Sequence, residues 1–375
     1  MSATPILQIG TSRFLQAHVD LFVSEALRQG SAVGPVTVVQ TSGDPGRSAR
    51  LAALSAKEGY EVQVRGVEGG QLIETQTRVT SVARTLSLPG DLDRVRDVVV
   101  NEARIILSNT ADAGFRPCEA DCRTTFDQAM SYPAKLTWLL YQRFRESGAG
   151  IQIMPTELVP HNGEVLRDLV FGIADLYPAV FRNWLESDVI WVNSLVDRIV
   201  SEPLEPAGAV AEPYAFWAIE DQPGLLVPCS HPDVRVVPSL EPFETLKLFI
   251  LNLGHTYLVS RWLAEVTLKR HKFVRDMLAD PEAAADLEDL YTREVVPGFA
   301  AHGRKDEAAA YVETTLDRFK NPFLDHKLAD IAQNHAEKIE RRIGAFLTWA
   351  RQANASFSAP RLDAISAASA KVRML

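Results

Sequence analysis

Apolar and polar residues follow two different periods along the chain. Runs rich in Ile and Val, typical of buried strands, occupy residues 5–10, 35–43, 103–114 and 151–159. Stretches with apolar residues at helical spacing occupy residues 13–30 and 132–148. Because buried strands that alternate with helices pair in parallel, this half of the chain predicts a doubly wound α/β sheet.

Two other patterns interrupt or follow this alternation. Strict alternation of apolar and polar residues at 60–66 and 71–85 predicts further strands, in an antiparallel insertion. After about residue 240 the apolar residues keep a helical period and no strand pattern recurs. We therefore expect two domains: an α/β domain over 1–240 and a mostly helical domain over 241–375.

Composition and charge exclude several classes of protein. A formal net charge of −9 without a basic stripe argues against nucleic-acid binding. The N-terminus lacks the features of a signal peptide, and apolar runs fall short of the ~20 residues of a membrane span. Three cysteines favour a reducing compartment. The pair Cys118 and Cys122 has no second pair to complete a metal site. We expect a cytoplasmic protein without a metal. The sequence does not indicate an oligomeric state.

The first strand ends in a glycine turn that leads into a helix. Such a turn opens a dinucleotide-binding, Rossmann-like domain. The full glycine pattern is broken here, because Ser12 and Leu15 take the places of two glycines. A turn of this kind also occurs without a ligand. If a dinucleotide binds, its pyrophosphate would lie at the helix start, where Arg13 adds positive charge. The candidate residues are Gly10, Thr11, Ser12, Arg13 and Phe14.

The end of the second strand bears on the choice between NAD and NADP. An acidic residue there would bind the ribose 2′-hydroxyl, but the strand ends in Gln40, Thr41 and Ser42, with Asp44 in the turn. Arg47 and Arg50 could meet a 2′-phosphate or be solvated helix residues. We expect NAD, with Thr41 and Ser42 near the ribose, and leave NADP open.

A strongly apolar helix near the start of the second domain carries unexpected polar residues. At 100° per residue, Asn252 lies about 140° and His255 about 80° around the helix from Lys247, with Glu244 at about 60°. The four residues thus fit one sector. They could be an ordinary snorkelling lysine and satisfied core groups. They could also be a site, since a desolvated lysine can act as a general base and an amide can stabilise an oxyanion.

This helix, read with the segment 192–200 (VNSLVDRIV), resembles the signatures of the polyol-specific long-chain dehydrogenases. Within that family, ILSNTADAG, MPTELVPHNGEVLRDLV and DRFKNPFLDHKLADIA are most similar to the tagaturonate reductases. The resemblance covers residues 5 to about 345 and implies a nicotinamide cofactor and no metal.

The resemblance also implies roles for individual residues. Lys247 would be the general acid and base, Asn193 and Asn252 would form the oxyanion hole, and His255 would orient the substrate. Glu244 matches a position that gates proton exchange between the lysine and solvent. The remaining implied positions are Asn109 and Thr110 at the nicotinamide ribose, Arg318, His326 and Lys327 on the substrate's hydroxyls or carboxylate, and Asp221 near the site.

We therefore expect an NAD-dependent oxidoreductase that interconverts a keto sugar acid and a hydroxy acid, of the tagaturonate/altronate type. Two alternatives remain. One is a polyol or polyol-phosphate dehydrogenase of the mannitol or mannitol-1-phosphate type. The other is a non-catalytic sugar-acid sensor that kept the fold, against which the complete set of lysine, asparagines and histidine argues.

Overall fold

A computed structural model describes residues 3–43, 46, 48–110 and 112–373. The chain divides into two compact units. The first comprises Met1–Gln63, Thr75–Ala211 and Ala215–Leu240. The second comprises Val64–Glu74, Glu212–Tyr214 and Glu241–Leu375. Two short segments from the first part of the sequence therefore belong to the second unit.

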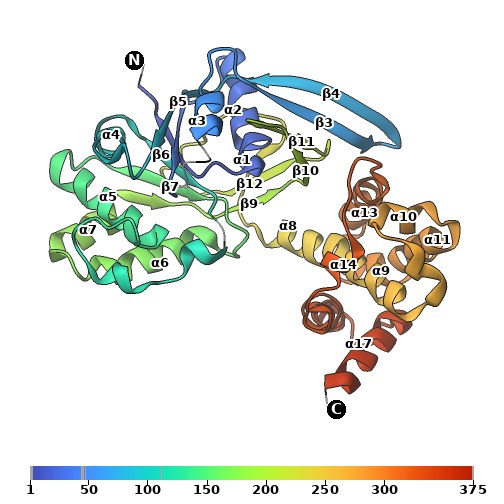
Figure 1. The fold of residues 1–375 in the computed structure, drawn as a ribbon. Helices are drawn as coiled ribbons and strands as arrows, with labels where there is room; N and C mark the ends of the chain where they lie inside the picture. Colours follow the sequence, from blue (N-terminus) through green and yellow to red (C-terminus); the bar gives the residue numbers. More distant parts are fainter. Residues whose placement is uncertain (1–2, 44–45, 47, 111, 374–375) are drawn as a thin grey trace. The chain divides into compact units, whose positions relative to one another are not determined.

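A six-stranded parallel sheet organises the first unit (Figure 1). Its strands are β1 (Ile6–Ile9), β2 (Val36–Gln40), β5 (Val82–Ser87), β6 (Ile105–Ser108), β7 (Ile151–Pro155) and β8 (Val189–Trp191). They lie in the order β5-β2-β1-β6-β7-β8. Counted within the sheet this is 3-2-1-4-5-6, the order of a dinucleotide-binding fold, so the predicted fold class is confirmed.

The order of the strands reverses between β1 and β6, which are neighbours in the sheet. Parallel strands point their carboxyl ends to the same edge, so the loops after β1 and β6 lie side by side. This is the position where open α/β sheets bind their ligands.

Helices and short helical turns connect the strands of the first unit. They are α1 (Arg13–Gln16), α2 (Val19–Arg28), α3 (Ser48–Leu54), α4 (Leu92–Asp97), η2 (Val98–Glu102), η3 (Asp112–Phe115), η4 (Glu119–Cys122), α5 (Tyr132–Glu146), α6 (Asn162–Ala174) and α7 (Ala179–Ser187). Apolar side chains of α4, η2, α5, α6 and α7 form one core with those of the sheet.

Two details differ from the sequence pattern. The helix expected over 13–30 is interrupted at Ala17 and His18, where the buried His18 ring donates from Nε2 to the Phe216 carbonyl oxygen at 3.1 Å. The alternating stretch 71–85 contributes to two sheets, because β4 (Gln71–Val79) ends before β5 begins at the edge of the parallel sheet.

Two smaller sheets complete the strands. One has the order β10-β11-β3-β4, with β3 (Tyr60–Glu68), β10 (Val200–Pro203) and β11 (Gly208–Ala211). The other has the order β13-β12-β9, with β9 (Ser194–Asp197), β12 (Phe216–Glu220) and β13 (Val234–Val237). The strands between 189 and 237 are too short to give a clear period in the sequence.

The second unit is helical between residues 241 and 373. Its elements are α8 (Glu241–Leu246), η5 (Lys247–Asn252), α9 (Leu253–Ala264), η6 (Val266–Arg270), α10 (Val274–Ala279), α11 (Pro281–Leu290), η7 (Tyr291–Val295), α12 (Val296–Ala301), α13 (Lys305–Lys320), α14 (Leu328–Ile331), α15 (His335–Lys338), η8 (Ile339–Gly344), α16 (Ala345–Ala353) and α17 (Pro360–Arg373). They share a second hydrophobic core.

The two added segments are bound to this unit by specific contacts. Glu212 accepts two hydrogen bonds from Arg318 on α13, at 3.0 and 2.8 Å. At the tip of the β3–β4 hairpin, Gly70 N–H donates to Asp317, and within β3 the Arg65 carbonyl oxygen accepts from Asn321. These contacts explain why residues 64–74 and 212–214 belong to the helical unit.

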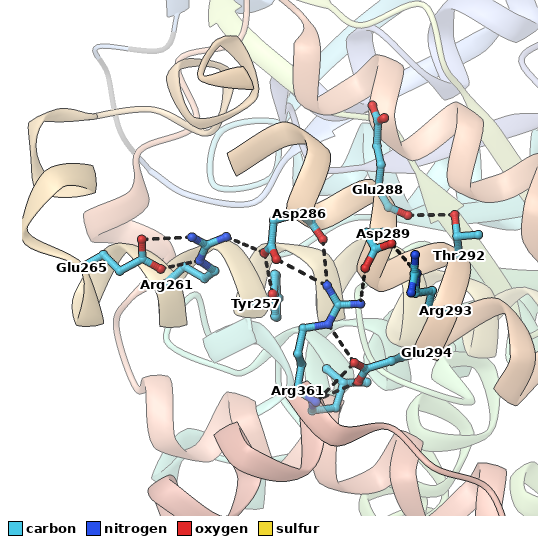
Figure 2. A network of polar contacts seen from close by, with 11 residues as sticks. Tyr257, Arg261, Glu265, Asp286, Glu288, Asp289, Thr292, Arg293, Glu294 and Arg361 are labelled. Carbon is cyan, nitrogen blue, oxygen red and sulfur yellow. Dashed lines mark hydrogen bonds and ion pairs between the residues drawn. The ribbon is translucent and has the colours of Figure 1, made fainter. Parts of the chain in front are cut away.

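A polar network fixes the last helix of the second unit (Figure 2). Arg361, near the start of α17, pairs with Glu294, Asp286 and Asp289 at 2.8, 3.4 and 3.0 Å. The buried Glu294 carboxylate also accepts from the backbone N–H groups of Arg361 and Leu362. The same carboxylate thus balances a cation and caps a helix N-terminus, which ties α17 to the core.

Candidate active site

A cavity of about 630 Å³ opens at the switch point of the parallel sheet, within the first unit. Its volume is in the range of small-molecule and cofactor sites. The lining residues are Gly10, Thr11, Ser12, Thr41, Arg50, Asn109, Thr110, Gly114, Arg116, Cys118, Ala129, Met130, Ser131, Tyr132 and Lys135. Six residues expected to bind a cofactor are among them: Gly10, Thr11, Ser12, Thr41, Asn109 and Thr110.

Gly10 is required by the geometry of the loop after β1. Its φ is 120°, and a Cβ atom there would lie 2.7 Å from the Asn109 carbonyl oxygen. Ser12, which stands where a second glycine was expected, has a structural role. Its hydroxyl accepts from Leu15 N–H as the cap of α1 and donates to Asn109 Oδ1 at 2.9 Å. The serine thus joins the loops after β1 and β6.

Three of the residues expected to bind a cofactor have other contacts. The Arg13 guanidinium donates to the carbonyls of Leu204 and Gly208 and pairs with Glu205. These contacts join Arg13 to the β10–β11 loop. The Phe14 ring stacks on His18, with ring centroids 4.7 Å apart, and the Ser42 carbonyl accepts from Gln40.

Positive charge in the cavity comes from residues that the glycine turn did not suggest. Arg50, Arg116 and Lys135 line it, and burial lowers the pKa of Lys135. Lys135 lies in the first turn of α5, and Ser131, the N-cap of that helix, also lines the cavity. These cations suit the pyrophosphate of a dinucleotide. Asp44 and Arg47 lie outside the described residues.

A buried carboxylate supports the loop after β6. Glu157 accepts from the backbone N–H of Thr110 at 2.8 Å and from the hydroxyls of Thr110 and Ser108 at 3.1 Å. Burial raises the pKa of Glu157. The sequence contained this residue in a strand end, without any spacing that would have paired it with Thr110. It holds the backbone where a nicotinamide ribose is expected.

Lys247 and Asn252 bound a π-helical turn, η5, inside the long helix formed by α8, η5 and α9. Leu253 N–H reaches the Leu248 carbonyl oxygen five residues back, in place of the usual four. The angles expected for an α-helix are therefore wrong here. π-helical turns are rare and often occur at functional sites.

The other substrate-binding candidates of this unit lie in different surroundings. His255 is 5% exposed and packs between Phe319 and His326, with ring centroids 4.3 and 4.6 Å away. Glu244 is half-buried on α8, and Lys327 is exposed before α14. Arg318 is buried, and its guanidinium pairs with Glu212 at 2.8 Å.

Asn193, in the first unit, is buried and held by two carboxylates. Its amide donates to Glu220 at 2.8 Å and to Glu164 at 3.3 Å, and its Oδ1 accepts from the Glu164 N–H at 3.1 Å. Asp221, which follows Glu220, donates its N–H to the Val237 carbonyl oxygen. Glu220 and Glu164 were not foreseen, since only the fold brings them to Asn193.

Residues 4–225 match the mannitol dehydrogenase Rossmann domain, and residues 239–370 match the mannitol dehydrogenase C-terminal domain. The chain belongs to the mannitol dehydrogenase family. The resemblance found in the sequence is thereby confirmed, as is the prediction of a dehydrogenase or reductase acting on CH–OH groups. No helix among the described residues is long and apolar enough to cross a membrane.

Similar proteins agree with this assignment. The altronate oxidoreductase of Bacillus subtilis (strain 168) is 30% identical over 363 residues, covering 90% of this chain and 73% of that protein. The altronate oxidoreductase of Escherichia coli O1:K1 / APEC is also 30% identical, with coverages of 96% and 78%.

Two solved structures share the fold. D-sorbitol dehydrogenase in substrate-free form has a TM-score of 0.79 at 19% identity, over 93% of this chain and 76% of that one. The Pseudomonas fluorescens mannitol 2-dehydrogenase ternary complex with NAD and D-mannitol has a TM-score of 0.73 at 18% identity, over 99% and 80%.

Proposed function

We propose that this protein is a cytoplasmic, NAD-dependent oxidoreductase that interconverts a keto sugar acid and the corresponding hydroxy acid. The leading substrate pair is tagaturonate and altronate. The proposal rests above all on the polar residues of the η5 helix in a chain whose relatives are named altronate oxidoreductases. Free cysteines at 118, 122 and 229 fit a reducing compartment.

The cavity at the switch point fits a dinucleotide. Gly10 and Ser12 leave its floor without bulky side chains, and Arg50, Arg116 and Lys135 supply positive charge. Asn109 and Thr110, fixed by Ser12 and Glu157, would hold the nicotinamide ribose. A nicotinamide bound there supplies or accepts the hydride.

The chain's own residues supply proton transfer and charge stabilisation. In reduction, Lys247 Nζ donates a proton to the carbonyl oxygen as that oxygen gains negative charge; in oxidation it removes the hydroxyl proton. The amide of Asn252 donates to the same oxygen. The family resemblance implies a second amide from Asn193, whose hydrogen bonds to Glu220 and Glu164 fix its orientation within the first unit.

Replacing Lys247 by alanine tests the role of the lysine. We expect turnover of tagaturonate with NADH to fall by roughly 10²–10⁴-fold, the usual contribution of a general acid or base. NADH binding, followed by its fluorescence, should stay within about twofold because the lysine is outside the dinucleotide cavity. Lys269→Ala, an exposed lysine of the same unit, is the control and should keep full turnover.

A substrate panel tests the rest of the proposal. Tagaturonate, fructuronate, fructose and fructose 6-phosphate are each offered with NADH and with NADPH. The keto sugar acids with NADH should give the highest kcat/KM. A preference for fructose or its phosphate would move the assignment to a polyol or polyol-phosphate dehydrogenase. Binding of tagaturonate without any oxidation of NADH would indicate a sensor.

A further inference from the structure

A second, smaller cavity lies in the helical unit, against Asn252. Its volume is about 200 Å³. The residues that line it are Leu248, Asn252, Asn334, Glu337, Lys338, Arg341 and Arg342. Three of them carry positive charge and one carries negative charge. They come from η5, α15, η8 and the residue before α15.

Two of these cations lack a carboxylate partner. Arg342 donates to the Asn252 carbonyl oxygen at 3.3 Å and to the Thr256 hydroxyl at 3.1 Å, and Lys338 donates to the Ile331 carbonyl oxygen at 2.8 Å. Among residues 3–43, 46, 48–110 and 112–373, no carboxylate lies within ion-pair distance of either cation. Arg341, by contrast, pairs with Glu337 at 3.5 Å.

Burial acts on both cations. It lowers the pKa of Lys338, which the charge of Arg342 lowers further and that of Glu337 raises; it also lowers the pKa of Arg342, as does the charge of Arg341. Two partly buried cations that line one cavity are costly unless an anion neutralises them. Such a pair facing a cavity is an anion-binding arrangement.

We propose that this cavity binds the carboxylate of the sugar acid, with Arg342 and Lys338 as its anchors. The inference rests on the proposed function and names the group of the substrate that this part of the site recognises. Arginine is well suited to the task, because its planar guanidinium can bind both carboxylate oxygens.

The position of the cavity suits a sugar acid that reacts at a carbonyl. Arg342 bonds to the backbone of Asn252, whose side-chain amide is proposed to meet the reacting oxygen. The volume is that of roughly seven waters at about 30 Å³ each, enough for a carboxylate and its neighbouring carbons. Arg318, expected from the sequence to hold the carboxylate, is occupied by Glu212.

The test compares anionic with neutral substrates in matched variants. Arg342→Gln and Lys338→Met should each lower kcat/KM for tagaturonate by roughly 10–100-fold, mainly through KM, since each removes a charge-assisted hydrogen bond. The kcat/KM for neutral tagatose should change less than about threefold. Arg342→Lys, which keeps the charge, should recover part of the loss. Arg293→Gln, which removes an exposed arginine of the same unit, should change neither value.

The outcomes separate the inference from the proposed function. If the wild type reduces tagaturonate but the variants lose activity equally on tagaturonate and tagatose, the carboxylate site is refuted and the function stands. If the wild type reduces only neutral ketoses, both are refuted. If fructose 6-phosphate depends on Arg342 and is preferred to tagaturonate, the cavity binds phosphate and the carboxylate assignment is overturned. Thermal unfolding of each variant establishes whether it folds. If Arg342→Gln does not fold, Lys338→Met provides an independent test of the carboxylate site.

Discussion

Asp20 on α2 is fully buried in the first unit, where one carboxylate oxygen accepts from the Tyr60 hydroxyl at 2.8 Å. Burial raises the pKa of this carboxyl to about 7. In the unfolded chain it ionises near pH 4. Between these two pH values the folded state keeps a proton that the unfolded state has released. The stability that depends on Asp20 being neutral is therefore fully present only below about pH 4. It is lost as pH rises towards 7.

Replacing Asp20 by asparagine should reduce this pH dependence. Between pH 5 and pH 7 the wild type should lose about 2 kcal/mol of unfolding free energy through Asp20, a loss that the variant does not share. Urea unfolding at several pH values measures the difference between the two proteins. Other groups, such as His18, cancel in that difference because both proteins contain them. Parallel curves for the two proteins would show that Asp20 does not titrate in this range.

At the same scale, the sequence indicated which residues are polar but not which partners they have. Arg13 and Arg318 were expected to meet ligands, and each is occupied by a glutamate far away in the sequence, Glu205 and Glu212 respectively. Ser12 was expected from the glycine turn, and Asn109 and Thr110 from the family resemblance; all three line the cavity. Hydrogen-bond partners that only the fold brings together leave no local pattern.

The helix that carries Lys247 depends on a close contact with a neighbouring helix. Tyr291 donates its hydroxyl to the Ile250 carbonyl oxygen at 2.9 Å, within the π-helical turn. The hydroxyl reaches this carbonyl because Gly254 has no side chain: a Cβ atom there would collide with it. The glycine in this helix is thus explained by packing.

Gly254→Ala should destabilise the protein by about 1–3 kcal/mol, the usual cost of forcing an extra carbon into a packed interior. Turnover should fall as well, since the turn that positions Lys247 and Asn252 must shift. Tyr291→Phe removes the hydroxyl and should tolerate the alanine better. Urea unfolding of the two single variants and the double variant measures this coupling. Strictly additive effects would contradict the proposed contact.

The helix itself was predictable, but its geometry was not. Apolar residues at a period near 3.6 predict a helix, and a single inserted residue hardly alters that pattern. The break at His18 was hidden for a similar reason, because the residues on both sides keep helical spacing. The parallel sheet was easier to predict, since its strands are buried on both faces and therefore apolar throughout.

At the scale of the whole molecule, neither unit is one continuous piece of sequence. Residues 64–74 and 212–214 complete the helical unit, although they lie in the first 240 residues. Sequence patterns placed the change from α/β to helical texture near residue 240 but had no means of showing these additions. Short segments are assigned by their contacts, and their contacts here lie 106 or more residues away.

Breaking the ion pair of Glu212 and Arg318 by substitution tests whether the helical unit needs its added segments for stability. Both side chains are 2% exposed, so Glu212→Gln removes the carboxylate charge that pairs with the buried Arg318 guanidinium and should destabilise this unit by roughly 3–5 kcal/mol. Hydrogen exchange of α13 measures the loss. Adding Arg318→Met should restore much of the protection, because it removes the buried guanidinium whose partner charge on Glu212 was lost. Unchanged exchange in Glu212→Gln would show that the segment is dispensable.

The tip of the β3–β4 hairpin also has a consequence for synthesis on the ribosome. Its partners Asp317 and Asn321 follow some 250 residues later in the chain. At about 5–20 residues per second, this separation corresponds to on the order of ten to fifty seconds. During that interval residues 64–74 have been synthesised, but their partners in the helical unit have not. All segments of the first unit precede residue 241, so that unit can fold first, whereas the helical unit can be completed only after residue 321 has been synthesised.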